Sequence, residues 1–169
     1  MKRVILSLMI ISLGILISCC HSNVTTLKKT DSHQALKSEA KILRSWQGDF
    51  PVNQLDRLPE VQGVGYIGDT QTFGTIWAAF KPGEEVPKID FNKELVLFVR
   101  NTQFYNRVSI GRVNVTDGVA EVLAMETMSA RPIEDKVAMS LAVIPRQGVR
   151  GVRSGNQIIS VQPGTTGQN

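Results

Sequence analysis

The alternation of apolar and polar residues between 45 and 162 predicts one helix and several strands. The helix begins after Asp69 or Thr70, either of which can cap it, and Pro82-Gly83 ends it. Its apolar residues recur at i, i+3, i+4 and i+7, the spacing of one helix face: Phe73, Ile76, Trp77 and Phe80. Gly74 is unfavourable inside a helix, which indicates a close contact between helix and sheet at that position.

Strands are predicted where apolar and β-branched residues run together or alternate. The clearest are Glu94 to Arg100, after a turn at 90–93, and a hairpin over 107–128 with Asp117-Gly118 as a two-residue type I′ turn. Further strands are expected at 46–50, 61–67, 137–145 and 156–161. One helix with mostly sequential strands and no βαβ alternation predicts an α+β fold, with a mostly antiparallel sheet packed against one main helix.

The first residues have the pattern of a secretory signal. Lys2 and Arg3 precede an uncharged run of fourteen residues, 4–17, which is short for a membrane-spanning helix. Leu16-Ile17-Ser18-Cys19 then resembles the lipobox of bacterial lipoproteins. In such precursors the signal is cleaved before the cysteine, whose thiol carries a diacylglyceryl group and whose new amine is often acylated (commonly with palmitate). The resemblance therefore implies lipidation at Cys19.

Other interpretations of the cysteine pair remain open. Processing at Cys20 would place Cys19 at the small-residue position, which fits less well. An uncleaved anchor helix over 4–20 would leave the domain in the same compartment. A disulfide between neighbours would be strained, and a metal site would have only His21 nearby.

The predicted organisation is therefore a signal peptide at 1–18, a lipidated N-terminus and tether at 19–44, a single domain at 45–162 and a flexible tail at 163–169. Within the tether, a short helix from Asp31 or Ser32 through Arg44 is one expectation, and a partly ordered stalk is the other. The expected location is the bacterial cell envelope, with a lipid anchor in the membrane (the outer membrane in a Gram-negative cell). The domain would face the periplasm or the exterior.

Charge argues against nucleic acid as a partner. Removal of 1–18 takes Lys2 and Arg3 from the 19 basic residues, which leaves 17 against 15 acidic ones. From Arg44 onward 13 basic residues face 13 acidic ones, whereas nucleic-acid binding normally requires a basic surface.

The sequence also favours a non-enzymatic protein without cofactor or metal. Gly63, Gly65 and Gly68 form a G-x-G-x-x-G pattern before the helix, but "LPEVQ" precedes it rather than a buried apolar strand, so a glycine-rich strand is the better interpretation. His21 and His33, the only histidines, precede the domain. An enzyme would depend on carboxylates alone, with these candidates: Asp49, Asp56, Glu60, Asp69, Asp90, Glu94, Glu121 and Glu126.

Two groups of residues are candidate contacts for a partner or an anion. Arg146, Arg150 and Arg153 lie in the glycine-rich "RQGVRGVRSG", where guanidinium groups suit carboxylate or phosphate. Phe104 and Tyr105 are possible interface anchors. A solvated loop, for the arginines, and a cap on the core, for the aromatic pair, are the alternatives.

Residues 60–161 resemble the C-terminal domain of the PrcB family, lipoprotein subunits of a spirochaete surface protease complex. The resemblance rests on "FGTIWAAF", "VPKIDFNKELVLFV", "RVSIGRV" and "SLAVIPR". It implies a lipid-anchored accessory or binding module with an envelope protein as partner, and brings no catalytic residues. The alternatives are a module that binds cell wall or an anionic polymer, and a carboxylate-dependent envelope hydrolase.

Overall fold

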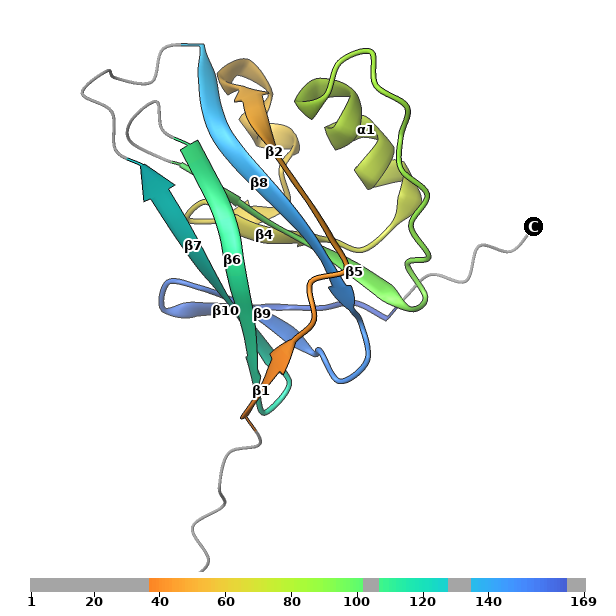
Figure 1. The fold of residues 1–169 in the computed structure, drawn as a ribbon, viewed down its shortest axis with the longest axis vertical. Coiled ribbons are helices and arrows are strands. Elements are labelled where there is room, and N and C mark those ends of the chain that lie inside the picture. The colour runs from red at the N-terminus through yellow and green to blue at the C-terminus, as the bar shows by residue number, and fades with distance from the viewer. Residues whose placement is uncertain (1–36, 102–106, 128–134, 164–169) are drawn as a thin grey trace, which may run out of the picture. The chain divides into compact units, whose positions relative to one another are not determined.

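The computed structural model describes residues 37–101, 107–127 and 135–163, and these form two five-stranded β-sheets (Figure 1). Sheet A has the order β1 (Lys37–Ala40), β6 (Arg107–Thr116), β7 (Val119–Thr127), β9 (Gly151–Ser154) and β10 (Gln157–Ser160). Sheet B has the order β2 (Arg44–Pro51), β8 (Lys136–Pro145), β5 (Glu94–Arg100), β4 (Val64–Ile67) and β3 (Glu60–Val61). Among the described strands every neighbouring pair is antiparallel except β7 and β9.

Sheet B is the middle layer, because its central strands β5 and β8 are buried on both faces. In β5, Leu95, Leu97 and Val99 belong to the core against sheet A, and Val96 and Phe98 belong to the core under the helix. The residues of β8 alternate in the same way between the two cores. Two-sided burial explains why both strands read as nearly continuous apolar runs instead of alternating.

Helix α1 (Thr70–Phe80) covers the outer face of sheet B, beside the short 3-10 helix η1 (Val52–Arg57). Asp69 caps α1 by accepting a hydrogen bond from the Thr72 amide at 2.8 Å, as the sequence predicts. The four apolar residues of the predicted helix face are buried, and Trp77 meets Trp46 of β2 edge to face, with ring centroids 5.1 Å apart.

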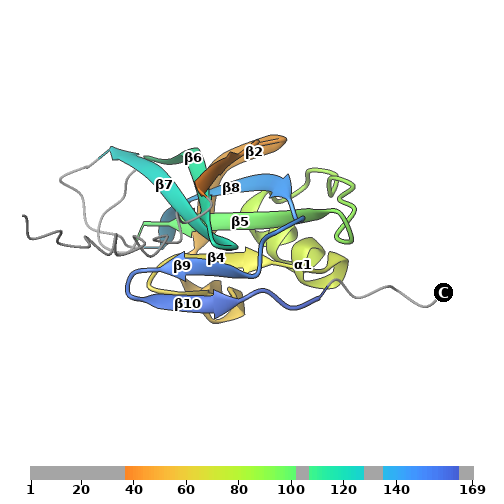
Figure 2. The ribbon, with the colours of Figure 1, turned by 90° about the horizontal axis from the view of Figure 1, so that it is seen from below.

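The two sheets are linked by hydrogen bonds as well as by apolar packing. The Ser140 hydroxyl of β8 lies in the space between them, where it accepts from the Ile110 amide of β6 and donates to the Trp46 carbonyl of β2. Near the other edge, where Figure 2 shows β9 alongside β4, Ser154 donates to the Val61 carbonyl. The sandwich is therefore tied at both edges.

The α+β prediction is wrong. Of the described residues 54% lie in strands and 15% in helices, and the strands form two stacked sheets instead of one sheet packed against a helix. The second sheet packs on the face of β5 and β8 that the helix does not cover. A local pattern does not reveal which strands share a sheet, because the pairing partners lie far apart in the sequence.

Three local predictions are also corrected. Residues 37–40 form strand β1 and not part of a helix, because they pair with residues 113–116 of β6. The expected strand at 61–67 is the hairpin β3–β4, whose turn residues Gln62 and Gly63 have positive φ angles of 50° and 82°. At Gly74 a Cβ would meet nothing within 4 Å, so no close helix–sheet contact requires that glycine.

The strand Glu94–Arg100 and the type I′ turn at Asp117-Gly118, with φ angles of 52° and 80°, are confirmed. Among the described residues, no helix has the length and apolar character to cross a membrane.

Candidate functional site

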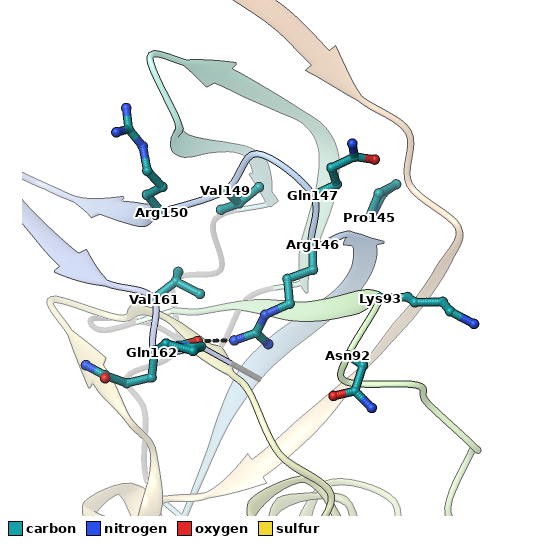
Figure 3. A pocket seen from close by; sticks show the side chains of 10 residues that line it. Asn92, Lys93, Pro145, Arg146, Gln147, Val149, Arg150, Val161 and Gln162 are labelled. Carbon is teal, nitrogen blue, oxygen red and sulfur yellow. Dashed lines mark hydrogen bonds between the residues drawn. The ribbon is translucent and has the colours of Figure 1, made fainter. Parts of the chain in front are cut away.

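The connection between β8 and β9, residues 146–150, borders a cleft of about 670 Å³, which we call the arginine cleft (Figure 3). Its lining combines cationic, amide and apolar side chains, and none of the described residues that line it is acidic. They are Asn92, Lys93, Pro145, Arg146, Gln147, Val149, Arg150, Val161, Gln162 and Pro163. A cleft lined by one sign of charge attracts ligand groups of the opposite sign.

Backbone hydrogen bonds hold the connection in place from three directions. The Arg146 amide donates to the carbonyl of Lys93, the residue before β5, at 2.8 Å. The Arg150 amide donates to the Gly118 carbonyl of the β6–β7 turn at 2.7 Å, and the Val161 amide donates back to the Arg150 carbonyl at 2.9 Å. The cleft is therefore built from segments that are fixed to one another.

The guanidinium of Arg146 spans the cleft. Its Nη1 donates to the Phe91 carbonyl at 3.1 Å, and its Nη2 donates to the Gln162 carbonyl. These bonds use two of the five N–H donors of an arginine. Arg146 is thus oriented by the protein and keeps donors for a ligand.

The three cations surround the cleft without meeting at one point. Figure 3 shows Arg146 reaching toward Gln162, whereas the ends of Arg150 and Lys93 point away from it in different directions. Arg150 donates to the Asp117 carbonyl at 2.8 Å, and Lys93 Nζ lies 3.3 Å from Asp90 Oδ2. Such spacing suits an extended ligand that carries a carboxylate better than a compact anion.

The structure separates the predicted contact residues. Arg146 and Arg150 lie together in the cleft, but Arg153 is exposed on β9 opposite Ile158 and does not line it. Phe104, Tyr105 and Cys19 lie outside the described residues.

The sequence analysis missed the cleft residues that come from other segments. Asn92 and Lys93 were interpretable only as part of a turn, and Gln162 only as the end of the domain. The signal that links them to Arg146 is long-range: the backbone bond to Lys93 and the side-chain bond to Gln162.

Several candidate carboxylates have structural partners. Arg100 Nε lies 2.7 and 2.8 Å from the two carboxylate oxygens of Glu60, and Glu94 pairs with Arg44 at 2.8 Å. Asp69 caps α1, and Asp90 accepts from the Asn92 amide within its turn. Across the described ranges no three histidine, cysteine, aspartate or glutamate side chains come together as a metal site.

No family model, curated protein or solved structure matches this chain. The resemblance to the PrcB C-terminal domain therefore stays a prediction.

Proposed function

We propose that this chain is a lipid-anchored, non-enzymatic accessory or binding domain of the bacterial cell envelope. In this proposal Cys19 carries the lipid, and the arginine cleft binds another envelope protein. One observation carries the binding role: Arg146 is held by the Phe91 and Gln162 carbonyls at the centre of a cleft lined by cations and amides. A cation held in place loses less side-chain entropy when it binds a carboxylate.

The same cleft supports one alternative, a module that binds cell wall or another anionic polymer. A carboxylate-dependent hydrolase has less support, because Glu60, Glu94 and Asp69 each have a structural partner.

Cross-linking in intact cells tests the proposal. The full, anchored chain with an affinity tag is compared with Arg146→Gln/Arg150→Gln and with Arg153→Gln, a control whose arginine lies outside the cleft. We expect one envelope protein to be recovered near stoichiometrically with the native chain and the control, and at least several-fold less with the double variant. Recovery of only lipid and wall fragments would reject the protein-binding role, and wall fragments that depend on Arg146 and Arg150 would favour the alternative.

The anchor is tested separately with the two adjacent cysteines. Cys19→Ser should block removal of residues 1–18 and acylation, whereas Cys20→Ser should leave both unchanged. Mass spectrometry of the N-terminal peptide and membrane fractionation measure these outcomes. The opposite pattern would move the lipid to Cys20, and no effect of either substitution would reject the lipid anchor.

A further inference from the structure

A second hollow adjoins the arginine cleft on the far side of Arg146. We call it the tyrosine hollow; its volume is about 400 Å³, and it lies between the β3–β4 hairpin, the start of α1 and the segment after β10. Arg146, Gln162 and Pro163 line both spaces. A ligand that contacts Arg146 is therefore at the border of the tyrosine hollow.

The walls of the tyrosine hollow are largely apolar. Val61 and Ile159 contribute partly exposed aliphatic side chains, and Tyr66 contributes its ring. A Cβ placed on Gly68 would lie 3.2 Å from the Tyr66 ring and 3.9 Å from Arg146 Nη1, so the glycine keeps the space between ring and guanidinium open. These dimensions suit one aliphatic side chain next to the cation.

Tyr66 is itself held in position. Its hydroxyl donates to the Ser160 carbonyl at 2.9 Å and accepts from the Gln162 amide at 3.0 Å. The hollow is thus formed before a ligand arrives, which lowers the entropic cost of binding.

Two carboxylates line the hollow, and each is already bound within the protein. They are Glu60, paired with Arg100, and Asp69, the cap of α1. Among the described residues that line the hollow, Arg146 is the one cation, so a second acidic group of a ligand would find no further counter-charge there, whereas an apolar group needs none. The two spaces therefore select different groups: a carboxylate on the cleft side of Arg146 and an aliphatic side chain on the other.

We propose that the two spaces together bind an extended peptide segment of the partner protein, in which an acidic residue lies within a few positions of an aliphatic one. The acidic side chain pairs with Arg146, and the aliphatic side chain enters the tyrosine hollow. The side-chain amides of Asn92, Gln147 and Gln162 are available to the peptide backbone. This inference rests on the proposed binding function and names its ligand class. A peptide is favoured over an anionic polymer because the apolar hollow lies directly beside the cation.

Binding of a defined probe tests the inference. The full chain in detergent micelles, labelled with ¹⁵N, is titrated with acetyl-Gly-Asp-Gly-Leu-Gly-amide, and the amide shifts are followed. We expect saturable shifts at Val149, Arg150 and Val161. Replacing the probe's aspartate with asparagine should weaken binding about tenfold, as expected for loss of a charge-assisted hydrogen bond.

Two variants separate the two halves of the site. Arg146→Gln should remove the preference for aspartate over asparagine in the probe. Thr72→Trp places a large side chain at the hollow and keeps the backbone amide that bonds to Asp69. It should remove the preference for the leucine probe over a probe with glycine in place of leucine. Arg153→Gln should change neither preference. The probe substitutions require no change in the protein, so they remain informative if Arg146→Gln fails to fold.

Equal binding of the aspartate and asparagine probes, or shifts confined to another surface, would overturn the inference. If the probe fails while cross-linking still recovers a partner that depends on Arg146, the ligand class is wrong and the binding function stands. If a soluble cell-wall digest displaces the probe and no envelope protein is recovered, the proposed protein-binding function fails instead.

Discussion

Arg100 at the end of β5 and Glu60 at the start of β3 form a double contact, with Arg100 Nε 2.7 and 2.8 Å from the two carboxylate oxygens. The side chains are only 16% and 10% exposed, so the charges are largely desolvated. The contact joins β3 and β5, the two strands that flank β4 in the antiparallel sheet, at the rim of the tyrosine hollow.

Glu60→Gln should lower the free energy of unfolding by about 2 kcal/mol, because it leaves the Arg100 guanidinium without its counter-charge in a desolvated position. Urea unfolding followed by the fluorescence of Trp46 and Trp77 measures the effect. Glu39→Gln is the matched control: its pair with Arg112 spans 3.3 Å at side-chain exposures of 60% and 58%, and its loss should cost below about 0.5 kcal/mol. Equal effects of the two substitutions would contradict the distinction between the pairs.

Two glycines should respond to alanine with opposite sign. At Gly65 a Cβ would lie 2.3 Å from the Pro59 carbonyl oxygen and 2.6 Å from the Phe98 ring, so Gly65→Ala should destabilise the domain by roughly 1–3 kcal/mol. At Gly74 the space is open and the backbone is helical, so Gly74→Ala should stabilise it by about 0.5–1 kcal/mol. Thermal unfolding of both variants checks the signs, and a destabilising Gly74→Ala would show that the helix needs the glycine.

Tyr66→Phe should loosen the segment after β10 without disturbing the core. The substitution removes the hydrogen bonds to Ser160 and Gln162, which should lower the free energy of local opening of this segment by about 1 kcal/mol. Hydrogen exchange should become faster at the Gln162 amide and stay unchanged in β5 and β8. Unchanged exchange at Gln162 would mean that other contacts hold this segment.

Gly118→Ala should lower the free energy of unfolding more than Gly83→Ala does, although the two glycines have nearly the same φ, 80° and 83°. Both substitutions impose backbone strain, but only at Gly118 would the Cβ lie 2.6 Å from Arg150 Nε. Urea unfolding should show the difference, and the displaced Arg150 should also weaken capture of the partner. Equal costs would mean that Arg150 moves aside freely.

Elements with a strong local pattern were predictable from the sequence. Helix α1 combines a capping aspartate with one apolar face, and the β6–β7 hairpin has Asp117-Gly118 at its turn. In both cases the residues that determine the element are neighbours in the sequence.

Elements defined by distant partners were not predictable in this way. Strand β1 is polar ("KSEA"), and Leu36, Ala40 and Leu43 follow a helical spacing, so only its pairing with β6 makes it a strand. Strand β9 is short and begins with glycine. It pairs in parallel with β7, and the paired residues Val119 and Gly151 are 32 positions apart in the sequence.

The candidate site was half predictable for the same reason. Clustered arginines in a glycine-rich stretch indicated Arg146 and Arg150, but a periodic pattern does not reveal which other segments a guanidinium will reach. The contacts that orient Arg146, the Phe91 and Gln162 carbonyls, lie 55 and 16 residues away.

The alternating side chains of β5 and β8 have a consequence for cooperativity. Since each of these strands supplies residues to both cores, neither core can come apart while the other stays intact. The two sheets are thus a single folding unit and not separable modules. A substitution at Phe98 or Leu141, under the helix, should therefore lower the melting temperature measured on the sheet A side as much as the one measured on the helix side.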